Sequence, residues 1–419
     1  MKINLVKCCG SNLLKYWHKS KVILMDNSFC VMPFLHLNVW QNGRIRPCCI
    51  SKDIGDVDLK VDSIEEAYNS GEFKKLRSDM IKGTQNSICS VCYDQERINS
   101  VSYRNVQNKK YAHFIEELKN NTNMDGSIKL NFRNLDLRLS NNCNLKCRTC
   151  SDESSTSWIK EKEELNKRFN WGVSPTNKLT SLNFDIDPNY IENVEHIYFA
   201  GGEPLYMREM YSFLDGVKNK ENVILFINTN FTIIKEGIFT DLFSKMKGVH
   251  FLISCDGVED VGEYVRTNVK WEAFKNNIET LISYEKKISS IHHTFQYTCS
   301  ILNCFHFFKY RKYLYEHEFI TNDNQIKFSY VSYPFWFDIL NFEEIKIKAI
   351  QYIQEGIADI NTESSLYVDL INYLNHLNLS SGENDKKISR DFLSKNINFG
   401  NEFNSTELPV DLNYLKSYL

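Results

Sequence analysis

Residues 135–150 read LDLRLSNNCNLKCRTC, an alternating strand-like segment that leads directly into three closely spaced cysteines. Cys143, Cys147 and Cys150 follow a C-x-x-x-C-x-x-C spacing, which random placement at about 3% cysteine would give in roughly one such chain in a hundred. Chance clustering and a zinc site are the alternatives, but zinc usually takes four ligands from two separated pairs. Three thiols from one loop favour a [4Fe–4S] cluster with one iron left open to a small molecule.

Outward from this motif, the region from about 135 to 335 alternates short apolar runs with amphipathic stretches, which predicts parallel β/α construction. The predicted strands are 135–140, 194–200, 222–229, 249–255, 293–301 and 326–332. The predicted helices lie near 206–218, 233–247, 271–287 and 305–317. The longer gap from 151 to 193 is expected to hold a helix and a polar insertion.

Polar motifs stand where the predicted strands end. AGGEP (200–204) follows the second strand, INTN (227–230) ends the third, and SCDG (254–257) ends the fourth. The carboxyl ends of parallel strands meet at one rim, so these motifs and the cysteine loop are expected to converge there. Gly201 and Gly202 would let the strand end approach a ligand without side-chain obstruction. Taken alone, GGEP is explained equally well by an ordinary strand-to-helix turn.

The cysteine loop, followed by a strand that ends in GGEP, resembles the radical S-adenosylmethionine (SAM) enzyme superfamily over roughly residues 130–340. The resemblance implies an α/β fold with a partial (β/α)6 barrel of the TIM type, open on one side. It also implies a [4Fe–4S] cluster on Cys143, Cys147 and Cys150. SAM would chelate the open iron of that cluster through its amino and carboxylate groups.

The same resemblance assigns residues to a SAM site. The GGEP turn would accept hydrogen bonds from the methionyl ammonium, and polar side chains at the third and fourth strand ends would bind the ribose and carboxylate. Arg266 matches a position near that carboxylate, although a solvated charge at a helix start explains it about as well. No catalytic residue is assigned. The expected SAM-binding residues are Gly201, Gly202, Glu203, Pro204, Asn228, Ser254, Asp256 and Arg266, with Asn230, Asn303 and Tyr330 as weaker candidates.

A second cysteine group lies upstream, where Cys30 precedes an alternating segment, a turn at Asn42–Gly43 and another short strand. The full spacing, C-x12-G-x4-C and then C-x2-C, resembles the twitch domain, a shortened SPASM domain that holds an auxiliary iron–sulfur cluster. Here it precedes the barrel, whereas better-characterised relatives carry it afterwards. Without the barrel motifs, a zinc ribbon of two cysteine pairs would be preferred. The implied auxiliary ligands are Cys30, Cys48, Cys89 and Cys92, with Cys49 as an alternative to Cys48.

Composition excludes other classes of protein. The 419 residues carry a net charge of −3, so no basic field recruits bulk nucleic acid, and no run approaches 18 apolar residues, so no membrane span is expected. Thirteen cysteines then indicate metal or redox chemistry in the reducing cytoplasm rather than disulfides. The cysteines outside the two groups are interpreted as packing or spare thiols: Cys8, Cys9, Cys255, Cys299 and Cys304.

The resemblance implies an oxidoreductase or modifying enzyme in which a 5′-deoxyadenosyl radical from SAM abstracts hydrogen from a substrate. An external donor of the flavodoxin or ferredoxin type would supply the electron. A peptide or protein is the favoured substrate, and a sugar or nucleotide-like small molecule is the alternative. A non-catalytic iron–sulfur or zinc-binding protein is the competing hypothesis. The expected domains are an N-terminal segment (1–27), the auxiliary cluster domain (28–115), the barrel (130–340) and a helical C-terminal extension (341–419).

Overall fold

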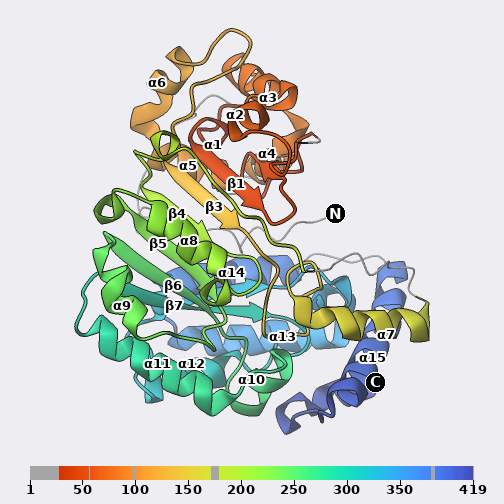
Figure 1. The fold of residues 1–419 in the computed structure, drawn as a ribbon. Coiled ribbons are helices and arrows are strands. Elements are labelled where there is room, and N and C mark those ends of the chain that lie inside the picture. Colours follow the sequence, from red (N-terminus) through yellow and green to blue (C-terminus); the bar gives the residue numbers. More distant parts are fainter. Residues whose placement is uncertain (1–27, 56, 98–100, 171–178, 379–382, 419) are drawn as a thin grey trace.

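One sheet of eight strands forms the centre of the computed structural model, which describes residues 28–55, 57–97, 101–170, 179–378 and 383–418 (Figure 1). The strands lie in the order β2-β1-β3-β4-β5-β6-β7-β8, and every pairing is parallel except that of β1 with β2. This confirms the predicted α/β class. The strands are β1 (His36–Trp40), β2 (Ile45–Arg46), β3 (Asn134–Arg138), β4 (His196–Phe199), β5 (Ile224–Thr229), β6 (Gly248–Ser254), β7 (Ile291–Cys299) and β8 (Ile326–Tyr330).

The six strands predicted between residues 135 and 335 are present as β3 to β8. Burial alternates with a period of two in β5, whereas the central residues of β6 are buried on both faces. In β5, Leu225, Ile227 and Thr229 are buried, whereas Phe226 and Asn228 on the opposite face are half-buried. The strand therefore presents apolar side chains to the helices and a mixed polar and aromatic surface to the other side.

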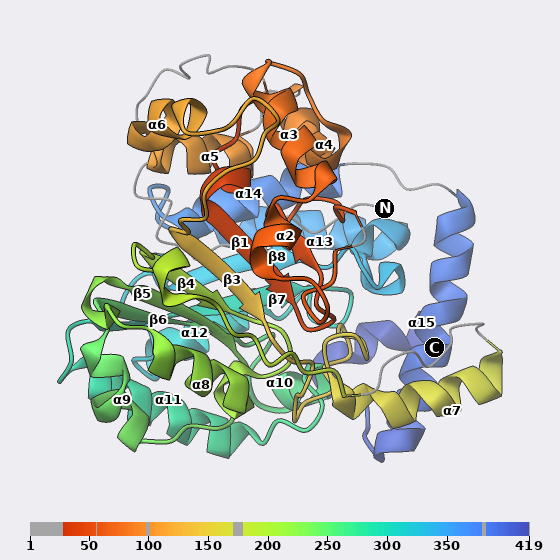
Figure 2. The same ribbon diagram turned by 45° about the horizontal axis from the view of Figure 1, so that its top comes forward.

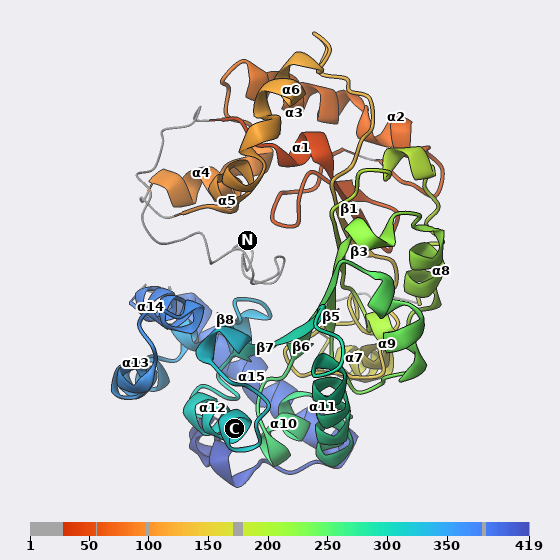
Figure 3. The same ribbon diagram turned by 90° about the vertical axis from the view of Figure 1, so that its left-hand side faces the viewer.

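Helices cover the convex side of the sheet, which Figure 3 shows as a curved band with α8, α9 and α11 along its outer side. The stretch predicted as one helix near 233–247 is shorter: it forms α9 and a 3₁₀ turn, so that Phe239 and Phe243 both contact Phe251 of β6. The sequence did not indicate α10, which follows SCDG. These helices are α7 (Ile159–Phe169), α8 (Arg208–Gly216), α9 (Gly237–Asp241), α10 (Glu259–Val265), α11 (Trp271–Glu285) and α12 (Phe307–Glu316).

The N-terminal hairpin is present as predicted, and it extends the main sheet. Gly43 in its turn has a φ of +88°, a conformation that favours glycine, and its N–H donates to the carbonyl oxygen of Trp40 at 2.8 Å. β1 pairs in parallel with β3, from His36 opposite Asn134 to Trp40 opposite Arg138. The hairpin is thus continuous with the strand that leads into the cysteine loop. The helices around it are α1 (Met32–Leu35), α2 (Ile64–Tyr68), α3 (Gly71–Ile81), α4 (Ser90–Arg97), α5 (Tyr103–Lys110) and α6 (Ile115–Asn120).

After β8 the chain is helical and returns across the molecule, where α15 lies beside α7 (Figure 2). α14 packs on the edge strand β8: Asp369 accepts hydrogen bonds from Lys327 Nζ at 2.6 Å and from the backbone N–H of Phe328 at 3.1 Å. Within the described ranges, no helix combines the length and apolar character needed to cross a bilayer. The C-terminal elements are α13 (Glu343–Gly356), α14 (Ser365–Leu377), α15 (Glu383–Asn404) and a 3₁₀ segment (Val410–Tyr418).

Two histidines buried on the strands make the stability of the fold sensitive to acid. Burial lowers the pKa of His36 and of His250 from 6.5 to about 3, and His250 Nε2 lies 2.7 Å from Thr294 Oγ1. Because the folded pKa is the lower one, stability is retained above pH 6.5 and is lost as the pH falls, by up to about 2 kcal/mol per histidine at pH 5. We expect His250→Gln to flatten the decrease in unfolding free energy between pH 7 and pH 5, measured by urea titration.

The matched control for that measurement is His113→Gln, since His113 is exposed. The control should show the same pH slope as the unmodified protein. An unchanged slope in His250→Gln would contradict the neutral, buried state of His250.

Candidate functional site

The cysteine loop that follows β3 is anchored by the end of α10 and by the segment that follows it. The backbone N–H of Lys146 donates to the carbonyl oxygen of Thr267 at 3.1 Å, and that of Arg148 donates to the carbonyl oxygen of Val265 at 2.8 Å. Both donors stand between cysteines in the sequence. Their bonds fix the backbone of the loop without engaging the thiols.

Side chains from the start of the next helix hold the cysteine carbonyls. Ser157 Oγ donates to the carbonyl oxygen of Cys143 at 2.8 Å, and Trp158 Nε1 donates to that of Cys147 at 3.0 Å. The backbone N–H of Cys150 donates to the same Cys147 oxygen at 2.9 Å. The loop therefore has a defined backbone shape before any ligand is considered.

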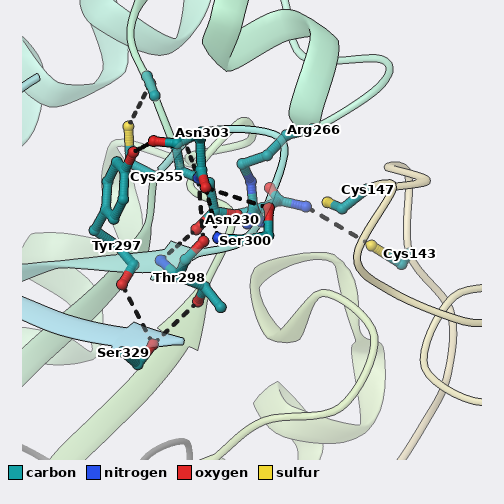
Figure 4. Close-up of polar contacts among 12 residues, drawn as sticks. Cys143, Cys147, Asn230, Cys255, Arg266, Tyr297, Thr298, Ser300, Asn303 and Ser329 are labelled. Atoms are coloured by element: carbon teal, nitrogen blue, oxygen red, sulfur yellow. Dashed lines mark hydrogen bonds and ion pairs between the residues drawn. The ribbon is translucent and has the colours of Figure 1, made fainter. Parts of the chain in front are cut away.

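The thiols lie in a shielded environment that contains hydrogen-bond donors. Burial raises the pKa of Cys143 to about 12, and neighbouring negative charge from Cys147 and Glu203 adds to the shift. Cys143 Sγ accepts a hydrogen bond from the N–H of Leu145 at 3.5 Å and another from Asn230 Nδ2 at 3.8 Å. Figure 4 draws the second of these bonds. The raised pKa means that the Cys143 thiol is protonated in the metal-free chain, whereas cation binding would displace that proton. Three soft donors on one loop, with two N–H groups directed at the sulfur of Cys143, fit an iron–sulfur cluster.

The glycines of GGEP lie against the cysteine loop itself. Gly201 has a φ of +88°, and a Cβ on Gly202 would lie 2.2 Å from the carbonyl oxygen of Asn142. The N–H of Glu203 donates to that same oxygen at 2.8 Å. Glycine is therefore required here because the backbone of the cysteine loop approaches closely. The sequence had instead predicted the close approach of a ligand.

The carboxylate of Glu203 is already occupied by protein donors. It is buried and accepts hydrogen bonds from Thr229 Oγ1 (2.6 Å), from the N–H of Asn230 (2.6 Å) and from the N–H of Leu205 (3.0 Å). Burial raises its pKa, and these bonds oppose the shift. Glu203 thus joins the ends of β4 and β5, while Pro204 begins a short 3₁₀ helix, Pro204–Tyr206.

Arg266 is half-buried beside the cysteine loop, with a side chain only 14% exposed, and it follows the last residue of α10, so the alternative of a solvated helix-start charge is wrong. Its Nη1 lies 2.8 Å from Asp256 Oδ2, and Figure 4 shows Arg266 beside Cys147. Burial disfavours the guanidinium charge, but the thiol of Cys147 and the Asp256 carboxylate outweigh burial and raise the pKa of Arg266. Asp256 Oδ1 also accepts the N–H of Thr298 at 2.8 Å. A fixed cation therefore lies next to the central thiol.

The remaining candidates fall into two sets. Asn228 Oδ1 is buried with no hydrogen-bond partner, and Asn230 and Ser254 line one small recess together with Arg266. Asn303, labelled in Figure 4, instead supports the backbone, because its Nδ2 donates to the carbonyl oxygen of Asp256 at 2.8 Å.

Tyr330 belongs to the contact between β8 and α14. Its ring stacks on His376 with centroids 4.0 Å apart, and on Tyr373 with centroids 5.3 Å apart. Its aromatic surface is thus engaged by α14.

The second cysteine group is gathered at the N-terminal helices and the hairpin. Burial raises the pKa of the Cys48 thiol, and so does charge interaction with Cys89, Cys30 and Cys92. Cys30 likewise interacts with Cys89 and Cys92. The four thiols predicted from the spacing are therefore mutual neighbours. Cys49 is also buried.

Outside these two groups, Cys255, Cys299 and Cys304 are buried in the core, as predicted for packing thiols. Cys8 and Cys9 lie outside the described residues. No disulfide joins the cysteines that the structure describes. Across the same residues, no three His, Cys, Asp or Glu side chains are already gathered closely enough to hold a single metal ion.

In a comparison with known domain families, residues 30–93 match SPASM, described as an iron–sulfur cluster-binding domain. This segment is SPASM-like. The SPASM-like segment contains the second cysteine group, so the match confirms the predicted auxiliary iron–sulfur region at family level. A search of curated proteins found no match.

Several solved structures resemble the chain in part. Hexahistidine-tagged anSMEcpe with bound AdoMet aligns at 16% identity over 59% of this chain and 60% of that chain, with a TM-score of 0.36. Native anSMEcpe with bound AdoMet and Cp18Cys peptide aligns at 18% identity over 59% and 62%, with a TM-score of 0.33. Streptococcus suis SuiB bound to S-adenosylmethionine aligns at 14% identity over 66% and 63%, with a TM-score of 0.35. The alignments thus span about three fifths of those proteins, and at these TM-scores none establishes a function for this chain.

The sequence analysis missed the residues that link the two cysteine groups. Trp40 of β1 lies with its ring 4.3 Å from the guanidinium of Arg46 and 4.6 Å from that of Arg138. Arg138 in turn pairs with the buried Asp136 at 3.3 Å. Gln41 Nε2 reaches the carbonyl oxygen of Glu153, just beyond the cysteine loop, at 3.0 Å. The signal was present in LDLRLS, where two charged residues share one face of a buried parallel strand.

Proposed function

We propose that the chain is a radical SAM enzyme with a partial (β/α)6 barrel, in which Cys143, Cys147 and Cys150 hold a [4Fe–4S] cluster. The proposal is supported above all by three thiols on one loop at the carboxyl edge of a parallel sheet, with the Arg266–Asp256 pair beside Cys147. Three protein ligands leave one iron open. When bound, such a cluster supplies an electron that cleaves the sulfur–C5′ bond of SAM and yields a 5′-deoxyadenosyl radical.

In this proposal, the residues around the loop bind and orient SAM. Arg266 Nε is buried without a hydrogen-bond partner and would donate to the SAM carboxylate. Asn228 Oδ1, also buried without a partner, would accept from an ammonium or hydroxyl group, and Ser254 would contribute a hydroxyl from the same rim. Gly201 and Gly202 would offer carbonyls.

The carboxylates of Glu203 and Asp256 would act mainly by position, because both already accept protein hydrogen bonds. Glu203 accepts from Thr229 and Asn230, and Asp256 accepts from Thr298 and Arg266. Holding these acceptors in place keeps the ends of β4, β5, β6 and β7 at fixed positions around the cysteine loop. Water entry and side-chain rearrangement are thereby limited where a reactive radical would form.

For the auxiliary cluster we propose Cys30, Cys48, Cys89 and Cys92. The mutual charge interactions of these four thiols support this set, and the G-x4-C spacing favours Cys48 over the adjacent, equally buried Cys49. Such a cluster would accept the substrate electron or anchor the substrate. A zinc ribbon formed from the same two pairs is the competing assignment, and metal analysis distinguishes the two.

We propose a peptide or protein as substrate, with a sugar or nucleotide-like small molecule as the alternative. On the sheet face away from α8 and α9, hydrogen-bonding residues such as Asp136 and Asn228 alternate with a small apolar cluster that contains Tyr198 and Phe226. Both classes of substrate could use such a surface. An external flavodoxin- or ferredoxin-type protein in the cytoplasm would supply electrons, and the outcome would be oxidation or modification of the substrate.

The decisive experiment is anaerobic reconstitution followed by incubation with SAM and dithionite. We expect 5′-deoxyadenosine by chromatography and a change in the EPR spectrum of the reduced cluster when SAM is added. Deuterium transfer from a labelled peptide or sugar into 5′-deoxyadenosine would then identify the substrate class. Full iron loading without 5′-deoxyadenosine and without a spectral response to SAM would instead favour a non-catalytic iron–sulfur protein. Zinc in place of iron would favour the zinc-binding alternative.

A further inference from the structure

The C-terminal end of the chain reaches the middle of the cysteine loop. Arg148, between Cys147 and Cys150 in sequence, is 5% exposed, and its Nη2 donates to Asn401 Oδ1 at 2.7 Å and to Thr406 Oγ1 at 3.1 Å. Its Nε donates to the carbonyl oxygen of Tyr264 at 3.0 Å, and its guanidinium lies 4.0 Å from that ring. These acceptors carry no formal charge; the nearby carboxylate of Glu161 interacts with the buried guanidinium through its charge, and the neutral oxygens complete its hydrogen bonds.

The preceding part of the loop makes a second contact with the same region. Lys146 Nζ lies 3.0 Å from the buried carboxylate of Glu161, which also accepts Asn404 Nδ2 at 3.0 Å. Gly400 provides the space for this arrangement, because a Cβ there would lie 2.8 Å from Arg148 Nη1. Both long basic side chains of the loop therefore reach α15, where Lys146 Nζ also lies 4.8 Å from the ring of Phe403.

The end of the chain also holds the loop that carries Asp256. The N–H of Val258 donates to His306 Nε2 at 3.2 Å, so that nitrogen is the acceptor and Nδ1 carries the proton. His306 Nδ1 faces Asp411 Oδ2 at 3.4 Å. Tyr414 then fastens the chain by donating to the carbonyl oxygen of Ile301 at 2.6 Å. We call residues 400–414, which make these contacts, the C-terminal strap.

We propose that the C-terminal strap positions both loops of the SAM site, acting on the cysteine loop through Arg148 and on the Asp256 loop through His306. This inference rests on the proposed function, because it concerns the same site. Arg148 and His306 are positioning residues: each touches a loop that would carry a ligand, and each is held by a residue more than a hundred positions away. A three-thiol site tolerates displacements of only about 0.5 Å, so the loop between Cys147 and Cys150 must be held from outside.

The first test is the double variant Asn401→Leu/Thr406→Val, which removes both side-chain acceptors of Arg148. Hydrogen bonds to a charged group of this kind correspond to roughly tenfold or more in an equilibrium. We expect an about tenfold faster loss of cluster absorbance to a chelator and a weaker EPR response to SAM. Hydrogen exchange of the peptide covering residues 143–150 should be faster in the metal-free chain. Equal chelation, EPR and exchange in variant and unmodified protein would overturn the inference.

Two variants of the same helix serve as controls. Asn401→Asp keeps an oxygen acceptor for Arg148 and should restore cluster retention. Glu402→Gln alters the neighbouring side chain, which pairs with the exposed Arg168 of α7 at 2.7 Å, and should behave like the unmodified protein. Equal impairment of all three variants would mean that α15 is merely structural, and would also overturn the inference.

The contact of the C-terminal strap with the Asp256 loop is tested separately with Asp411→Ala. We expect a KM for SAM raised about tenfold, with an unchanged rate of cluster loss, because His306 acts on the Asp256 loop alone. An unchanged KM would overturn the inference that the C-terminal strap positions the Asp256 loop. If the unmodified protein itself shows no EPR response to SAM, the proposed function fails, whereas the exchange of residues 143–150 still decides whether the strap holds the cysteine loop.

Discussion

Replacing Cys143, Cys147 and Cys150 together by alanine is expected to lower the iron content from about eight to about four atoms per chain and to abolish 5′-deoxyadenosine formation. The three thiols belong to one anchored loop, and their removal leaves the thiols of the SPASM-like segment in place. Anaerobic iron and sulfide analysis with EPR measures the first effect, and chromatography measures the second. Eight irons in the variant, or retained cleavage of SAM, would contradict the assignment.

Matched controls come from the other cysteines of the chain. Cys304→Ala removes a thiol buried in the core at 1% exposure, so it should lower stability slightly and leave the iron content unchanged. Cys48→Ala should remove the other four irons, whereas Cys49→Ala should not. A loss of iron in Cys49→Ala alone would exchange the roles of these neighbours.

Gly202→Ala is expected to be the most damaging single methyl group that can be added at the site. The new Cβ would lie 2.2 Å from the carbonyl oxygen of Asn142 and 2.7 Å from its carbonyl carbon, and these backbone atoms cannot rotate away. The cysteine loop must therefore move, at a cost of about 2–4 kcal/mol in the free energy of unfolding. Urea titration measures this loss, and reconstitution should yield fewer irons per chain.

Gly216→Ala is the control for this variant, because a Cβ on Gly216 at the end of α8 would meet nothing within 4 Å. That substitution should change the free energy of unfolding by less than about 1 kcal/mol. If Gly202→Ala were as stable as Gly216→Ala and kept its iron, the close approach of GGEP to the cysteine loop would be refuted.

The strands of the main sheet could be predicted because their signal is local. In β5, for example, Leu225, Ile227 and Thr229 alternate with half-buried residues, a pattern visible within six positions. The pairing of β1 with β3 could not be predicted in this way, since His36 and its partner Asn134 are 98 residues apart. Nothing in either segment marks the other as its neighbour.

The same distinction between local signals and contacts of distant residues applies to the candidate site. Cysteine spacing identified both thiol groups, because ligands to one cluster recur at short intervals. The sequence predicted Glu203 as a SAM-binding residue. Only the folded structure shows that its carboxylate already accepts hydrogen bonds from Thr229 and Asn230. The partners of Arg148 lie 253 and 258 residues away, in the polar stretch NFGNEFNST, where several side chains could have served as acceptors.

The pairing of β1 with β3 also sets an order for the folding of a newly made chain. Leu37 and Val39 of β1 are fully buried in the finished protein, yet β3 leaves the ribosome about a hundred residues later. Contacts so distant in sequence carry a large loop-closure cost and form slowly. A nascent chain that ends before Arg138 therefore lacks the strand on which the hairpin rests. The segment that contains the second cysteine group therefore gains its partner strand only when β3 has been made, and β3 is the strand that leads into the loop of Cys143, Cys147 and Cys150.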